Sequence, residues 1–85
     1  MVGPTNTEVT KFVFMLLPKF SLMAFTSAIE PLRIANRLSG REIYGWRLAS
    51  DDGVSATCSA AVTVSVEMGL DSVDRNETIM FCGGL

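Results

Sequence analysis

Two long apolar runs along this chain predict buried strands. Residues 12–17 form an unbroken apolar run of strand length that ends at Pro18. An unbroken run, in contrast to an alternating one, is typical of a strand that is covered on both faces in a parallel sheet. A second run of this kind, residues 78–82, leads into Gly83-Gly84. We expect the two runs to be neighbouring parallel strands of one sheet.

A helix is predicted after the first of these strands. Ser21 is a suitable N-cap, and the apolar residues that follow it recur at spacings of three and four. These residues are Leu22, Phe25, Ile29, Leu32, Ala35 and Leu38. Pro31 lacks a backbone donor and its ring clashes with the preceding turn, so we expect either a kink near residues 27–30 or two abutting helices. Gly40 is the expected C-cap.

The remaining segments predict a second strand and a hairpin. The second strand starts at Tyr44 and is stopped by residues 51–53, Asp-Asp-Gly. Residues 54–57 and 61–66 are rich in β-forming types and predict a hairpin, and residues 68–75 predict a loop or a single helical turn. This order predicts an α/β fold with a mainly parallel sheet. With one substantial helix, one face of the sheet lacks its cover, so we expect the N-terminal portion of a larger domain.

Composition and charge exclude some classes of protein. The 85 residues are 48% hydrophobic and 19% charged, which is typical of a chain that folds around a core. The net charge of −2 and the scattered Lys and Arg residues offer no basic stripe for nucleic acid. Residues 1–10 lack periodicity and are predicted to be a disordered leader, so that the folded domain spans residues 11–85.

The candidate chemistry is sparse. The chain has no histidine, and Cys58 and Cys82 lack CxxC spacing, so we expect no metal and no cofactor. We expect the two cysteines to be buried for structural reasons, and the alternative is a disulfide between them. The apolar run at residues 12–17 is too short for a signal peptide or a membrane span, and it ends at Pro18. We therefore expect a cytoplasmic protein without membrane contact.

Four segments in this order resemble the start of GlxA-type regulators, which belong to the AraC family of transcriptional regulators. The segments are residues 12–22, 28–40, 44–48 and 82–85, and the resemblance covers nearly all of the chain after the leader. It implies an N-terminal domain similar to class I glutamine amidotransferases and PfpI-like peptidases, with a three-layer, flavodoxin-like fold. It also implies that DNA is bound by a C-terminal pair of helix-turn-helix motifs, which these residues do not contain.

The resemblance further implies a sensor without catalytic residues. Related enzymes carry a glutamate in the first turns of the helix after the first strand, and the matching position here is Ala24. A methyl group cannot accept a proton or orient a thiol, which argues against catalysis. The implied function is effector sensing for a transcription regulator, and the alternative is an amidase-like or peptidase-like enzyme of the same superfamily.

Three residues are candidates for effector binding. Gly83 and Gly84 match a position where related enzymes form an oxyanion site from backbone N–H groups, which in a sensor would hold an effector carboxylate. The alternative is a tight turn after a strand. Phe20 either closes over a cationic effector or packs onto the helix as a hydrophobic staple. The effector class implied by the resemblance is a nitrogen-containing metabolite, such as an amino acid or a quaternary amine.

Glu30 and Arg33 are candidates for a dimer interface. They stand three residues apart on the predicted helix, so they can pair with each other on a solvated face. Alternatively they face a second subunit, because members of the superfamily often form homodimers through this region.

Overall fold

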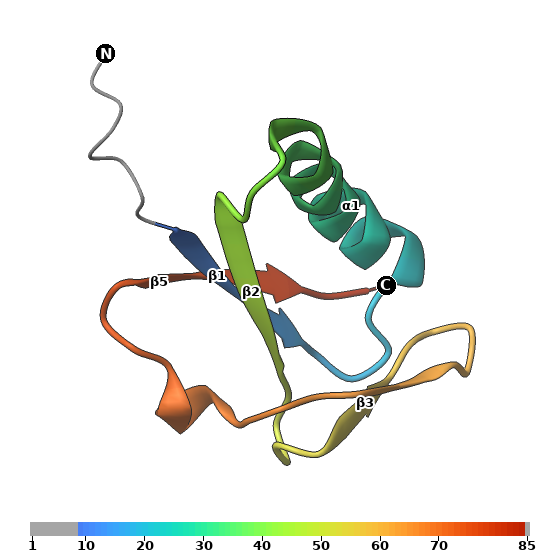
Figure 1. Cartoon of the computed structure of the whole chain (residues 1–85). Helices are drawn as coiled ribbons and strands as arrows, with labels where there is room; N and C mark the ends of the chain where they lie inside the picture. Colours follow the sequence, from blue (N-terminus) through green and yellow to red (C-terminus); the bar gives the residue numbers. More distant parts are fainter. Residues whose placement is uncertain (1–8, 85) are drawn as a thin grey trace.

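The computed structural model describes residues 9–84. The elements are β1 (Thr10–Leu16), α1 (Leu22–Ser39), β2 (Tyr44–Ala49), β3 (Ser55–Thr57), β4 (Thr63–Ser65), the 3-10 helix η2 (Leu70–Ser72) and β5 (Glu77–Cys82). Residues 1–8 of the predicted leader lie outside the described residues, and β1 begins at Thr10, the last residue of that predicted leader. Figure 1 shows the order of these elements along the chain.

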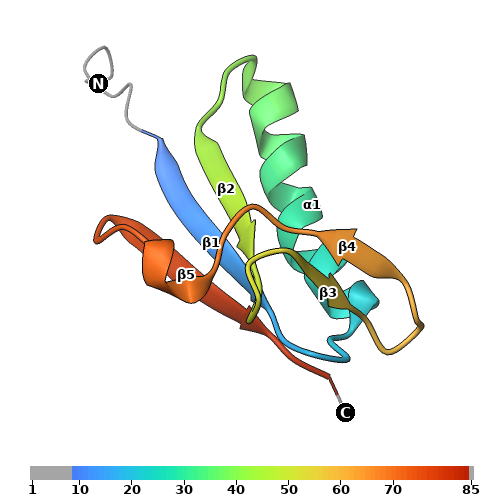
Figure 2. The same cartoon turned by 90° about the horizontal axis from the view of Figure 1, so that it is seen from below.

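The three longer strands form one parallel sheet in the order β2-β1-β5. The register places Phe14 of β1 between Leu48 and Met80. The prediction that residues 12–17 and 78–82 are parallel neighbours is confirmed, and so is the α/β class with a mainly parallel sheet. The strands β3 and β4 form the predicted hairpin, which is antiparallel and stands beyond the carboxyl ends of β1 and β2 (Figure 2).

The predicted caps of α1 are confirmed. The hydroxyl oxygen of Ser21 accepts a hydrogen bond from the amide of Ala24 at 3.1 Å, and Gly40 ends the helix with a positive φ of 75°. The helix runs unbroken across Pro31, so the alternative of two abutting helices is wrong. Because Pro31 has no backbone N–H, the carbonyl oxygen of Ser27 lacks its usual hydrogen-bond partner in the helix. Both residues are exposed, so water can bind this carbonyl oxygen.

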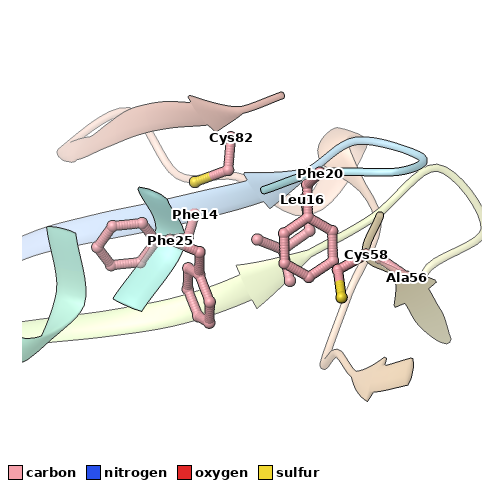
Figure 3. Close-up of a cluster of buried hydrophobic side chains, with 7 residues drawn as sticks. All are labelled: Phe14, Leu16, Phe20, Phe25, Ala56, Cys58 and Cys82. Carbon is pink, nitrogen blue, oxygen red and sulfur yellow. The ribbon is translucent and has the colours of Figure 1, made fainter. Parts of the chain in front are cut away.

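The face of the sheet under α1 carries the main hydrophobic core. Its buried members are Phe14, Leu16, Phe20, Phe25, Ala56, Cys58 and Cys82, and Figure 3 shows their side chains between the sheet, the helix and the hairpin. The ring of Phe25 meets the ring of Phe14 edge to face, with centroids 5.6 Å apart. The alternate residues of β1 thus bury their side chains against the helix, as a strand period of two requires.

The opposite face is covered by residues 67–76, here called the cover segment. Figure 1 shows this segment, with η2, below the sheet while α1 lies above it. Val13 and Met15 of β1 are 0% and 3% exposed there, and Met68 and Val73 pack against them. The expectation of an uncovered face is therefore wrong over β1. On β5, however, Phe81 remains 62% exposed.

Candidate ligand site at the carboxyl ends of the strands

A tight turn connects β1 to α1 at the carboxyl end of the sheet. The amide of Phe20 donates to the carbonyl oxygen of Leu17 at 3.0 Å, which closes a four-residue turn with Pro18 and Lys19 at its centre. Lys19 has a φ of 62°. Proline followed by a residue of positive φ is the type II pattern, in which the second central position usually holds glycine. The shape of this turn is therefore set by its own four residues.

Backbone hydrogen bonds join this turn to the hairpin and to the end of β5. The amide of Lys19 donates to the carbonyl of Thr57, and the amide of Ser59 donates to the carbonyl of Phe20, both at 2.9 Å. On the other side, the amide of Ser21 donates to the carbonyl of Gly83 at 2.9 Å. Three segments that are distant in the sequence thus form one connected rim without using a side chain.

Position 84 requires glycine because the backbone of the turn after β1 packs closely against it, and not because the chain turns there. A Cβ on Gly84 would overlap the carbonyl oxygen of Lys19 and would lie 3.3 Å from the carbonyl carbon of Phe20. A Cβ on Gly83 would meet only the Leu17 side chain, at an ordinary 3.9 Å. Of the two adjacent glycines, Gly84 is the one at which the backbones approach too closely for any other residue.

An open hollow of about 520 Å³, here called the glycine hollow, is lined by Ser21, Ser59, Gly83 and Gly84. It lies beside the N-terminus of α1, whose first turn contains no acidic residue. Helix N-termini favour anions because their first N–H groups are unpaired and the helix dipole is positive there. The structure thus brings both predicted glycines together with two hydroxyl groups. Ser59 was not identified from the sequence, because it reaches the hollow only when the hairpin folds back onto the turn.

The ring of Phe20 is buried, in contrast to its predicted role over a cationic effector. Its exposed fraction is 0%, and its ring meets that of Phe25 edge to face with centroids 6.0 Å apart. Phe20 directly precedes the N-cap and Phe25 is the fourth residue of the helix, which is the hydrophobic staple arrangement. The alternative of simple packing is therefore the one that the structure adopts, and the ring is not available at the surface.

Glu30 and Arg33 pair with each other on the exposed side of α1. The shortest contact joins Arg33 Nη2 to Glu30 Oε1 at 2.6 Å, and both side chains are about half exposed. The hydrogen bonds from Arg33 are the main cause that lowers the pKa of the Glu30 carboxyl. The local pairing predicted for these residues is confirmed, while their role in a dimer stays a prediction.

A second hollow of about 660 Å³ lies between the turn and the hairpin, and its lining includes Lys19, Asp51, Asp52, Thr57 and Cys58. The carboxylate of Asp52 accepts hydrogen bonds from the amides of Val54 and Ser55 and from the hydroxyl of Ser50. These bonds, the backbone ones first, lower the pKa of Asp52. Because its carboxylate holds the loop after β2, Asp52 has a structural role at this hollow.

The amino ends of the strands are held by side chains. Arg47 forms a two-bond ion pair with Glu77, at 2.9 and 2.6 Å, which crosses the central strand on the side of the cover segment. Only 4% of the Glu77 side chain is exposed. The hydrogen bonds from Arg47 are the largest cause that lowers the pKa of Glu77. Nearby, the amide side chain of Asn36 bonds to the amides of Ile43 and Tyr44 and to the Tyr44 carbonyl.

The described residues offer little catalytic chemistry. Cys58 and Cys82 are free and buried, as predicted, and burial raises the pKa of the Cys82 thiol, which disfavours the reactive thiolate. Ala24, the position at which the resemblance implied a missing glutamate, is exposed in the first turn of α1. Between residues 9 and 84, no cluster of three His, Cys, Asp or Glu side chains has metal-binding geometry. No helix in this part of the chain has the length and apolar character of a membrane span.

Comparison with known proteins connects this chain to transcription regulators. It is 38% identical over 84 residues to the HTH-type transcriptional regulator GbdR of Pseudomonas aeruginosa, an alignment that covers 99% of this chain and 23% of the regulator. It is 41% identical over 62 residues to the HTH-type transcriptional regulator GlxA of Rhizobium meliloti, which covers 64% of this chain and 19% of that protein. No family model matches the chain.

One solved structure has a similar fold. The crystal structure of an AraC family transcriptional regulator from Pseudomonas putida superposes with a TM-score of 0.78 at 26% identity, over 88% of this chain and 40% of that one. The homologues of this chain are thus HTH-type and AraC-family transcriptional regulators. The chain spans about a quarter of the length of the curated relatives that it matches.

Proposed function

We propose that this chain is part of the effector-sensing domain of an AraC-family transcription regulator. The observation that carries the proposal is the 38% identity to an HTH-type regulator over 99% of this chain. The acidic net charge of −2 agrees with a part that does not contact DNA itself. In the proposed protein, DNA is bound through a C-terminal helix-turn-helix domain, and the folded part has the flavodoxin-like, amidotransferase-like architecture that the sequence predicts. The proposed location is the cytoplasm.

The glycine hollow is the proposed effector site. It lies at the carboxyl ends of the parallel strands, where open α/β sheets bind ligands. Between residues 9 and 84, the backbone amides of Gly83 and Gly84 donate to no other described residue. These amides and the hydroxyls of Ser21 and Ser59 are suited to a carboxylate. The proposed effector is a small metabolite that carries a carboxylate and a nitrogen, such as an amino acid or a quaternary amine.

The proposed mechanism is a shift between two states of the regulator. An effector changes the activity of an attached DNA-binding domain only if it binds more tightly to one of these states than to the other. The rim provides a route for this difference, because the turn after β1, the hairpin and the end of β5 meet there through backbone hydrogen bonds. An effector seated in the hollow contacts two of these segments and the start of α1.

A thermal-shift series on the protein that contains this chain tests the effector site. Amino acids and quaternary amines are the ligands, and an effector raises the melting temperature through mass action. The variant Gly83→Val fills the hollow without a backbone clash, since a Cβ at this position has room. We expect G83V to lose the shift, while Ser65→Val, which adds the same side chain at an exposed position of β4, retains it. An equal shift in both variants would place the effector elsewhere.

The reading frame downstream of codon 85 separates the sensor from the enzyme alternative. Two helix-turn-helix motifs in that frame support the sensor. A nucleophilic cysteine on a strand-to-helix elbow with a histidine nearby, together with turnover of a chromogenic amide that is lost on Cys→Ala, would establish the enzyme instead.

A further inference from the structure

The second hollow, of about 660 Å³ between the turn after β1 and the hairpin, is here called the hairpin hollow. Three of the residues that line it, Leu16, Ala56 and Cys58, are at most 8% exposed and belong to the main core. Ser50 is also buried, but its hydroxyl already donates a hydrogen bond to Asp52. The buried part of the lining is therefore suited to an apolar group of a ligand.

The rim of the hairpin hollow carries one positive and one negative side chain. Lys19 belongs to the turn after β1 and Asp51 to the loop after β2, and both residues are exposed. Between residues 9 and 84, neither side chain forms a hydrogen bond or an ion pair, either with the other or with a third residue. The hollow thus offers two opposite charges that the described part of the fold does not use.

Backbone strain is concentrated at the same hollow. Among residues 9–84, the residues other than glycine that have a positive φ are Lys19, at 62°, and Ala61, at 66°. Both line the hairpin hollow. A positive φ costs free energy in a residue with a Cβ, and residues strained in this way cluster at ligand sites. A lysine at the turn position that glycine fits best indicates a use for its side chain.

We propose that the hairpin hollow binds a zwitterion with an apolar body, that is, an amino acid with an aliphatic side chain. The carboxylate of the ligand pairs with the ammonium of Lys19, and its ammonium pairs with the carboxylate of Asp51. The aliphatic group covers the apolar part of the lining. This site is separate from the glycine hollow, with which it shares Ser59, and it does not rest on the proposed function.

Three ligands with the same aliphatic group test the two charges separately. L-leucine carries both charges, 4-methylpentanoate lacks the ammonium, and 3-methylbutylamine lacks the carboxylate. Titration calorimetry measures their binding to the protein that contains this chain. We expect leucine to bind about threefold to fivefold more tightly than either analogue, which is the range for one exposed ion pair.

Two variants assign each charge of the ligand to its partner. Lys19→Met and Asp51→Asn each remove one charge and keep the size of the side chain. We expect K19M to weaken the binding of leucine and 4-methylpentanoate about threefold and to leave 3-methylbutylamine unchanged. D51N should weaken leucine and 3-methylbutylamine and leave 4-methylpentanoate unchanged. Lys11→Met and Asp71→Asn are the matched controls, because both residues are exposed and lie outside this lining.

Gly83→Val separates this site from the proposed effector site, because it fills only the glycine hollow. The proposal predicts that G83V binds leucine as the natural protein does. An effector in the glycine hollow shows the opposite pattern, since its binding is lost in G83V and unchanged in K19M and D51N. Leucine with that opposite pattern would overturn this proposal and support the proposed function. A natural protein that binds none of the three ligands, or that binds all three equally, would also overturn it.

Discussion

The two ends of the parallel sheet are stabilised in different ways. At the carboxyl ends, the turn after β1 is connected to the hairpin and to β5 by backbone hydrogen bonds and by the close approach of Gly84 to Lys19. At the amino ends, one backbone hydrogen bond joins Thr10 to Ile43, and the Arg47–Glu77 ion pair and the side chain of Asn36 make further connections. The carboxyl ends of the three strands are thus joined to their surroundings through the backbone, whereas side chains contribute the main connections at the amino ends.

This difference bears on function. A rim joined by backbone hydrogen bonds leaves its remaining N–H groups and small side chains available to a ligand, and no charged side chain takes part in the bonds that join its three segments. An end held by charged side chains uses those charges for the fold, so they are not available for binding. The contrast supports a ligand site at the carboxyl ends and a structural role for the amino ends.

The largest expected effect is that of Gly84→Ala. The added methyl group overlaps the Lys19 carbonyl, so the turn and the end of β5 must separate. We expect a loss of about 2 to 3 kcal/mol in the free energy of unfolding, measured by chemical denaturation. Gly83→Ala is the control and should change the stability little. Equal effects for the two glycines would mean that the rim is not closely packed.

A smaller effect is expected for Asn36→Ala at the other end. The substitution leaves the amides of Ile43 and Tyr44 and the Tyr44 carbonyl without their partner. Loss of these partly buried hydrogen bonds should cost about 1 to 2 kcal/mol. Hydrogen exchange should show the opening confined to the start of β2, with the amides of Lys19, Ser21 and Ser59 protected as before. Faster exchange at the rim would contradict the independence of the two ends.

The smallest effect is the contribution of Glu77, at the amino ends, to the dependence of stability on pH. The pKa of Glu77 is lowered in the folded chain from a usual value of 4.5. A lowered pKa contributes stability above the unfolded value, and this contribution is lost as the pH falls through the folded value. We expect Glu77→Gln to be less stable than the natural chain at neutral pH and to approach it in acid. Parallel pH curves for the two proteins would show that the ion pair does not stabilise the fold.

Local sequence patterns were sufficient for the elements of this fold. The apolar runs predicted β1 and β5, and Ser21 and Gly40 predicted the ends of α1, because caps and strand runs depend on neighbours in the chain. Contacts between distant segments were not predictable in this way. The burial of Phe20, the overlap that requires Gly84 and the cover of Val13 by Met68 each depend on the tertiary arrangement. Gly83 and Gly84 were identified through a family resemblance, and their difference became visible only in the structure.

The central claim, that an effector binds at the carboxyl ends of the strands, is tested most directly by the amide resonances of glycine. The protein that contains this chain is labelled with ¹⁵N-glycine and titrated with the effector that raises its melting temperature. The account predicts shifts at Gly83 and Gly84 and none at Gly45, which lines a hollow of about 430 Å³ at the amino ends. Shifts at Gly45 with unchanged Gly83 and Gly84 would contradict it.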